Sequence, residues 1–152
     1  MPPDKSPEPI EVLMAVRTIP NATGAPGYSV TMPCSIENAA PVRRFVREVA
    51  GAWGLDDLAD DTALVVTELV ANAAQHTKSP LMRVSITRPD PDLIRVAVTD
   101  RSRTFPTMQS SSVTDERGRG LALINALTER WGAETRPWGK QVWGELKGKT
   151  SA

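Results

Sequence analysis

The chain has 152 residues, enough for one domain with a sizeable core and little room for a second. Its hydrophobic content of 40% and charged content of 24% are typical of a soluble globular protein. Eighteen basic and eighteen acidic residues balance, so the composition gives no indication of a direct nucleic-acid or polyanion partner.

The cysteine usage and the apolar runs bear on location. The single Cys34 cannot form an internal disulfide and offers no metal-binding pair, so we expect a buried or incidental thiol and a cytoplasmic protein. No apolar run approaches the ~20 residues of a membrane helix. The apolar segment from Ile10 to Ile19 is interrupted by Glu11 and Arg17, unlike a signal peptide. We therefore expect no membrane association.

The first part of the chain is rich in proline. Residues 1–26 carry six prolines and are expected to form an irregular N-terminal arm. Apolar residues alternate from Tyr28 to Pro33, which predicts the first strand. The globular domain is expected over residues 27–148, followed by a short tail at 149–152.

Two helices are predicted next. The first starts at Asn38, tolerates Pro41 in its first turn and ends at Gly54. Its apolar residues recur at the spacing of a core face: Val42, Phe45, Val46, Val49 and Trp53. Its basic residues lie off this face and are expected to be solvated: Arg43, Arg44 and Arg47. The second helix is expected to begin near Asp56 or Asp57.

A hairpin and a long polar segment follow. Alternating apolar residues predict strands over 82–87 and 94–99, joined by a turn that contains two prolines and two aspartates. The seventeen residues from Arg101 to Arg117 are rich in Ser and Thr. Loops of this length are uncommon in compact domains and are typical of functional lids or disorder.

One more helix and two strands close the chain. The helix is predicted from Leu121 to Trp131, and the strands from Ala133 to Arg136 and from Gln141 to Leu146. Strands grouped beside helices, with hairpin rather than βαβ spacing, predict an α+β two-layer sandwich. We expect a mixed, mostly antiparallel sheet covered by helices on one face.

The second helix carries an unusual polar stripe. Glu68, Asn72 and His76 stand at i, i+4 and i+8, within one quarter of the helix circumference. The residues opposite form an apolar stripe: Val66, Leu69, Val70 and Ala73. A solvated face is the commoner interpretation of such a stripe. However, Asn is a weak helix former and the stripe lacks Lys and Arg, which favours a nucleotide and metal site instead.

Two further positions suit a nucleotide. Asp100 extends a strand and shares its face with Val96 and Val98, so it is either a turn residue or an acceptor for an exocyclic amine such as that of adenine. Gly118-Arg119-Gly120 directly precedes a predicted helix, where free backbone N–H groups attract phosphate. A plain flexible turn explains the same glycines.

Taken in order, these motifs resemble those of the histidine-kinase-like (GHKL) ATPases. Within them the chain is similar to the small anti-sigma-factor serine/threonine kinases of actinobacterial type. Residues 68–73 match the N box, with His76 following, and residues 118–121 match the second glycine box. Residues 139–143 are similar to the closing strand, and the resemblance spans about residues 28–146.

The resemblance implies a Bergerat, or histidine-kinase-like ATPase, fold that uses ATP and Mg²⁺. It implies that Glu68 is the general base, that Asn72 ligates Mg²⁺, and that Asp100 binds the adenine amine. The other nucleotide-binding residues that it implies are His76, Gly118, Arg119, Gly120 and Leu121.

The implied function is that of an ATP-dependent kinase that regulates transcription. It would phosphorylate a Ser or Thr of an antagonist protein and also sequester a sigma factor, and homodimerisation is expected. One departure from the family pattern supports an alternative. The first glycine box reads Asp-x-Gly-x-Gly, but residues 101–104 contain no glycine. The alternative is an inactive nucleotide-sensing or nucleotide-free partner-binding module.

Overall fold

The computed structural model describes residues 17–19, 27–76, 80–101, 116–137 and 139–148. Within these ranges lie six strands, three α-helices and a short 3-10 helix. In chain order they are β1 (Arg17–Ile19), β2 (Gly27–Pro33), η1 (Ile36–Asn38), α2 (Ala39–Ala52), α3 (Asp56–His76), β3 (Leu81–Asp90), β4 (Leu93–Asp100), α4 (Glu116–Leu127), β5 (Arg130–Arg136) and β6 (Gly139–Lys147). No helix in these ranges is long and apolar enough to cross a membrane.

All six strands form one sheet in the order β1-β2-β3-β4-β6-β5, and every neighbouring pair is antiparallel. The α+β prediction is confirmed, but the expected mixed pairing is wrong for the strands described here. Strand β1 is a second correction, because it lies within the segment expected to be irregular. Arg17 stands opposite Ser29, and three residues are too few to give a periodic signal. The remaining residues of 1–26, and the tail at 149–152, lie outside the described residues.

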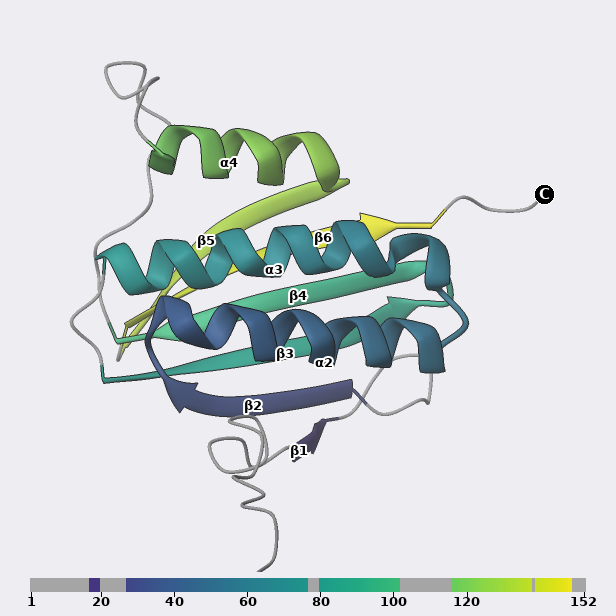
Figure 1. The fold of residues 1–152 in the computed structure, drawn as a ribbon, viewed down its shortest axis with the longest axis horizontal. Helices are drawn as coiled ribbons and strands as arrows, with labels where there is room; N and C mark the ends of the chain where they lie inside the picture. The colour runs from purple at the N-terminus through teal and green to yellow at the C-terminus, as the bar shows by residue number, and fades with distance from the viewer. Residues whose placement is uncertain (1–16, 20–26, 77–79, 102–115, 138, 149–152) are drawn as a thin grey trace, which may run out of the picture.

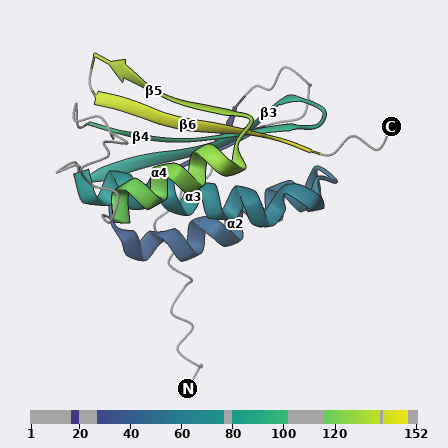
Figure 2. The same cartoon turned by 90° about the horizontal axis from the view of Figure 1, so that it is seen from above.

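The three helices cover one face of the sheet, with α3 in the middle and α2 and α4 on either side (Figures 1 and 2). This confirms the predicted two-layer arrangement. The core lies between the layers because alternate strand residues point toward the helices. The strands contribute Val30, Met32, Met82, Val84, Ile86, Ile94, Val96, Val98, Val142 and Leu146. The apolar stripe predicted on α3 is buried as expected: Val66, Leu69, Val70 and Ala73.

Helix α3 runs antiparallel to β6, which decides where its polar residues lie. Close contacts mark the direction: Gly148 lies near Leu58, and further along the strand Gly144 lies near Val65. The helix rises ~1.5 Å per residue and the strand ~3.3 Å. With these rises per residue, the last third of α3 lies at the end of the sheet where β6 begins and β4 ends (Figure 1).

The predicted bounds of α2 and α3 hold. Helix α2 follows a 3-10 turn whose preceding residue, Ser35, accepts a hydrogen bond from the N–H of Glu37. Gly54 adopts a left-handed φ of 74° between the two helices, a conformation that favours glycine at a helix end. Helix α3 begins at Asp56, one of the two expected positions. The basic residues of α2 are exposed or half-buried, as expected of a solvated face.

The last helix differs from its prediction. Helix α4 begins at Glu116, so the expected long loop is shorter, and residues 102–115 lie outside the described residues. Two glycines suggested a start after position 120, but the helix accommodates them within its first turns. It ends at Leu127 rather than Trp131, because the N–H of Glu129 already donates to the carbonyl of Glu145 at the start of the β5 pairing.

The face of the sheet away from the helices carries a compact cluster around Trp143. The guanidinium carbons of Arg95 and Arg130 lie 4.2 Å and 5.6 Å from the centre of the indole ring. Both guanidinium groups donate to Glu145, at 3.1 Å and 2.5 Å. Beneath the ring, a Cβ on Gly132 would lie only 2.9 Å from the indole. This packing fixes the closing strands against β4.

Candidate nucleotide site

The polar stripe of α3 is not a solvated face. Asn72 is only 6% exposed and Glu68 is half-buried. The Nδ2 atom of Asn72 is buried without a hydrogen-bond partner in the described structure. A buried amide without a partner costs free energy comparable to a lost hydrogen bond, so it marks a place where a ligand group can pair with it. His76 is the last residue of α3, and its side chain lies outside the described part.

The first turns of α4 lie directly against Glu68. A Cβ placed on Gly120 would be 2.5 Å from Oε2 of Glu68 and 3.5 Å from its Cδ. Any residue larger than glycine would require the carboxylate, the flexible end of its side chain, to move. The structure therefore brings together two motifs that stand about fifty residues apart in the sequence. Gly118 and Arg119 belong to the same helix start, but their surroundings lie outside the described part.

Leu121 follows Gly120 in α4. Its side chain is fully buried in the core between α4 and the sheet. Any contact that it makes with a nucleotide is therefore a main-chain contact. The apolar side chain instead holds the start of α4 in place beside α3.

Asp100 is buried at the end of β4, on the helix-covered face, as the alternation predicted. It is 3% exposed and stands directly opposite Lys140, the second residue of β6, which is 2% exposed. Facing residues of an antiparallel pair place their side chains on the same side of the sheet. Sequence reasoning missed Lys140. Its signal was the alternation with Val142 and Leu146, which assigns it to the inner face.

The charges around Asp100 influence one another. Burial lowers the pKa of Lys140, and the neighbouring carboxylate of Asp100 opposes that shift. Burial also raises the pKa of Cys34, and the charge of Asp100 raises it further. The N–H of Cys34 donates to the carbonyl of Pro80, which ties the end of β2 to the start of β3. The single thiol is half-buried and lies beside the charged end of the site.

Gly139 fixes the backbone around Asp100. A Cβ at this position would collide with the carbonyl oxygen of Asp100 and would lie 2.6 Å from the Cα of Arg101. Here glycine permits a close approach of two backbones. The end of β4 and the start of β6 are thereby held together, and with them the facing carboxylate and ammonium groups.

Comparison with known protein families gives a match over most of the chain. Residues 32–144 match the histidine kinase-like ATPase domain family. The chain belongs to this family. The matched region includes α3, α4 and the strand ends that carry Asp100 and Lys140, and the family's ATPase domain implies ATP binding.

A curated relative matches part of the chain. The uncharacterized protein SCO4941 of Streptomyces coelicolor is 50% identical over 44 residues, which are 28% of this chain and 42% of the relative. The match thus spans less than half of the relative's length, and the relative's description assigns no activity.

The donor set of this histidine kinase-like ATPase domain fits a magnesium ion held mainly by its nucleotide. Among the described residues, no three His, Cys, Asp or Glu side chains gather as a metal site. Mg²⁺ is usually bound through one or two protein oxygens together with substrate phosphates and water. The amide oxygen of Asn72, one turn from the carboxylate of Glu68, could supply such an oxygen, and the unpaired amide nitrogen would be left to donate to a phosphate oxygen.

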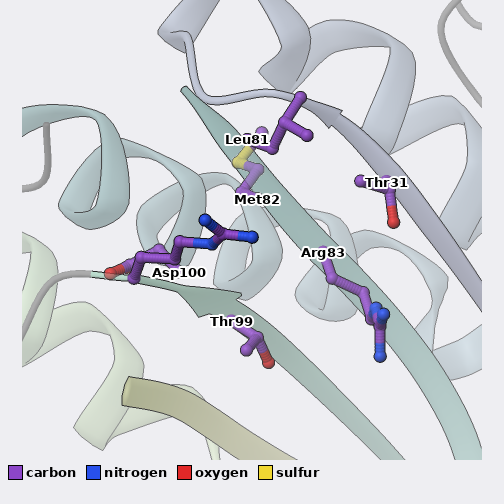
Figure 3. Close-up of a pocket in the computed structure, with 7 residues that line it drawn as sticks. Thr31, Leu81, Met82, Arg83, Thr99 and Asp100 are labelled. Carbon is purple, nitrogen blue, oxygen red and sulfur yellow. The ribbon is translucent and has the colours of Figure 1, made fainter. Parts of the chain in front are cut away.

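A separate hollow lies at the same end of the sheet but opens on the other face. Its volume is about 340 Å³, and the strands separate it from the helices, which lie behind them in Figure 3. Its lining residues are Thr31, Leu81, Met82, Arg83, Thr99, Asp100 and Arg101. Asp100 thus lines this hollow, whereas Glu68 and Asn72 do not.

Proposed function

We propose that this protein is an ATP-dependent serine/threonine kinase of the anti-sigma-factor type. The observation that carries the proposal is the contact of Gly120 with the carboxylate of Glu68, one helical turn from the buried amide of Asn72. In this proposal the free N–H groups of the first turn of α4, ahead of Gly120, bind phosphate. Glu68, which Gly120 contacts, is the carboxylate that accepts a proton. Phosphoryl transfer depends mainly on positioning and charge neutralisation, so few side chains are needed.

In this proposal each side chain has one task. Asp100 accepts a hydrogen bond from the adenine amine and so fixes the base at the sheet end. Glu68 accepts the proton of a Ser or Thr hydroxyl of the substrate. At the same time the oxygen of that hydroxyl bonds to the γ-phosphorus. The bond from that phosphorus to the β–γ bridging oxygen breaks, and ADP leaves. Asn72 holds Mg²⁺, which when bound neutralises charge on the phosphates.

The substrate in this proposal is a small antagonist protein. The kinase also sequesters a sigma factor and in this way regulates transcription. Two copies of the chain form the working unit, and the protein acts in the cytoplasm. The support for these partners is the similarity of the N box and of the second glycine box to those of anti-sigma-factor kinases.

The test is phosphate transfer from [γ-³²P]ATP. Purified protein is incubated with heat-treated lysate of the source organism, in which endogenous kinases are inactive, and labelled bands are analysed for phosphoserine and phosphothreonine. We expect one labelled small protein with the wild type and a loss of about 10²- to 10⁴-fold with Glu68→Gln, which removes a general base but keeps the shape. Full labelling by Glu68→Gln would show that the carboxylate is not the base.

A second function is favoured by the residues that follow Asp100. The two positions at which the family's first glycine box has glycine are occupied by Ser102 and Thr104, and neither residue allows the backbone freedom of glycine. In this alternative the domain binds a nucleotide or a partner without transferring phosphate. It predicts that no wild-type labelling occurs under any condition, while partner binding is unchanged in Asn72→Ala.

A further inference from the structure

Lys140 is a buried charged residue to which the proposed function gives no task. It is 2% exposed and is among the largest fully buried side chains of the described structure. An ammonium group is costly to remove from water unless it is paired, and lysine is rarely found fully buried. The facing carboxylate of Asp100 offsets part of this cost.

The position of Lys140 connects it with the base end of the site. It faces Asp100 across the β4–β6 pairing, on the helix-covered side of the sheet. Gly139, the preceding residue, allows the two backbones to approach closely at this point. The last third of α3, which carries Asn72, reaches the same end of the sheet. An ammonium group thus lies beside the carboxylate assigned to the adenine amine.

The chemistry of adenine matches such a pair. Its exocyclic amine is a donor, and the ring nitrogens N1 and N7 on either side of it are acceptors. A carboxylate alone can accept only from the amine. An ammonium group has three N–H donors, so it can serve a neighbouring carboxylate and still donate to a ring nitrogen. Guanine presents a carbonyl oxygen where adenine presents the amine, and that oxygen would face the carboxylate.

We propose that Lys140 is a base-reading residue that donates a hydrogen bond to the adenine ring nitrogen next to the amine, N1 or N7, while Asp100 accepts from the amine. This inference rests on the proposed function, because it takes the adenine position from Asp100. It adds a specificity-determining contact, because recognition of adenine then depends on the Lys140 donor and the Asp100 acceptor together.

The test compares ATP with 1-deaza-ATP and 7-deaza-ATP, which each lack one ring acceptor. Affinities are measured by competition with a fluorescent ATP analogue in the presence of Mg²⁺. Because hydrogen bonds to charged groups are the stronger ones, we expect one deaza analogue to bind the wild type on the order of tenfold or more weakly than ATP. We expect Lys140→Met to bind ATP and the weakened deaza analogue with equal affinity. In Lys140→Arg, part of the affinity difference between ATP and that analogue should return.

The controls separate base reading from a merely structural role. If Lys140 only neutralises Asp100, Lys140→Met weakens all three nucleotides by the same factor, which overturns the inference. Lys147→Met, an exposed position at the other end of β6, is expected to leave all affinities unchanged. Should Lys140→Met not fold, the wild-type series decides alone, because equal binding of ATP and both analogues also overturns the inference. A wild type that binds no ATP refutes the proposed function itself.

Discussion

Replacement of Gly120 by alanine tests the contact between α3 and α4 most sharply. The added Cβ would lie 2.5 Å from Oε2 of Glu68, whereas real Cβ contacts essentially never fall below 3.0 Å. The carboxylate must therefore move by about half an ångström or more, since it is the flexible end of its side chain. A displacement of ~1 Å at a reacting group costs on the order of 100-fold in rate. We expect ATP turnover to fall about ten- to a hundred-fold.

The fold should survive this change. Alanine is favoured over glycine in a helix interior by up to ~1 kcal/mol, so the melting temperature of Gly120→Ala should equal or exceed that of the wild type. The matched control is Gly51→Ala in α2, where a Cβ would lie 3.4 Å from Oδ1 of Asp56, an ordinary contact. Phosphate release from MgATP and thermal melting are measured for all three proteins. A folded Gly120→Ala protein with wild-type turnover would refute the assignment of Glu68 as the base.

Three further predictions concern the surroundings of the site and the closing strands. Asn72→Ala removes a buried nitrogen without a partner and adds a better helix former, so urea denaturation should give an unfolding free energy equal to the wild type or higher by up to ~1 kcal/mol. A clear loss of stability would mean that the protein itself satisfies this amide. Burial raises the pKa of Cys34. At pH about 8, iodoacetamide should therefore react more slowly with Cys34 than with the thiol of glutathione, whose pKa is near the ordinary range. Equal rates for the two thiols would contradict the burial. Burial acts to raise the pKa of Glu145, but hydrogen bonds from Arg130 and Arg95 outweigh it, and the net pKa lies below the ordinary 4.5. The stability from this carboxylate is therefore present above pH 4.5 and lost as the pH falls through the lower folded-state pKa, so acid unfolding of Glu145→Gln should depend less steeply on pH below 4.5 than that of the wild type.

Much of the fold followed from periodicity. Helix α3 and the strands of the hairpin have long, regular apolar patterns, and these fixed their type and buried face. Asp100 was assigned to the inner face by the same alternation, which the structure confirms. Strand β1 gave no such signal, because it has only three residues. The start of α4 was misassigned because glycines usually mark helix ends, whereas Gly120 lies within this helix to accommodate Glu68.

The site itself was predictable only in part. The spacing of Glu68 and Asn72 indicated a shared helix face. Glu68, however, contacts Gly120 of α4, and a local pattern does not encode the approach of that helix. Lys140 stood in a predicted turn between Pro137 and the closing strand, where a lysine is unremarkable. Its meaning depends on the pairing of β6 with β4, a contact between residues 40 positions apart in the sequence. Long-range pairing of this kind is set by the whole sheet rather than by local propensity.

The central claim is that Asn72 and the start of α4 form a magnesium-dependent ATP site. The most direct measurement is a titration of the purified protein with a fluorescent ATP analogue, with Mg²⁺ and with excess chelator, for the wild type and for Asn72→Ala. The account predicts saturable binding by the wild type that weakens when Mg²⁺ is removed, and weak binding by Asn72→Ala that is indifferent to Mg²⁺. Binding by the folded wild type that is absent, or that is the same with and without Mg²⁺, would contradict it.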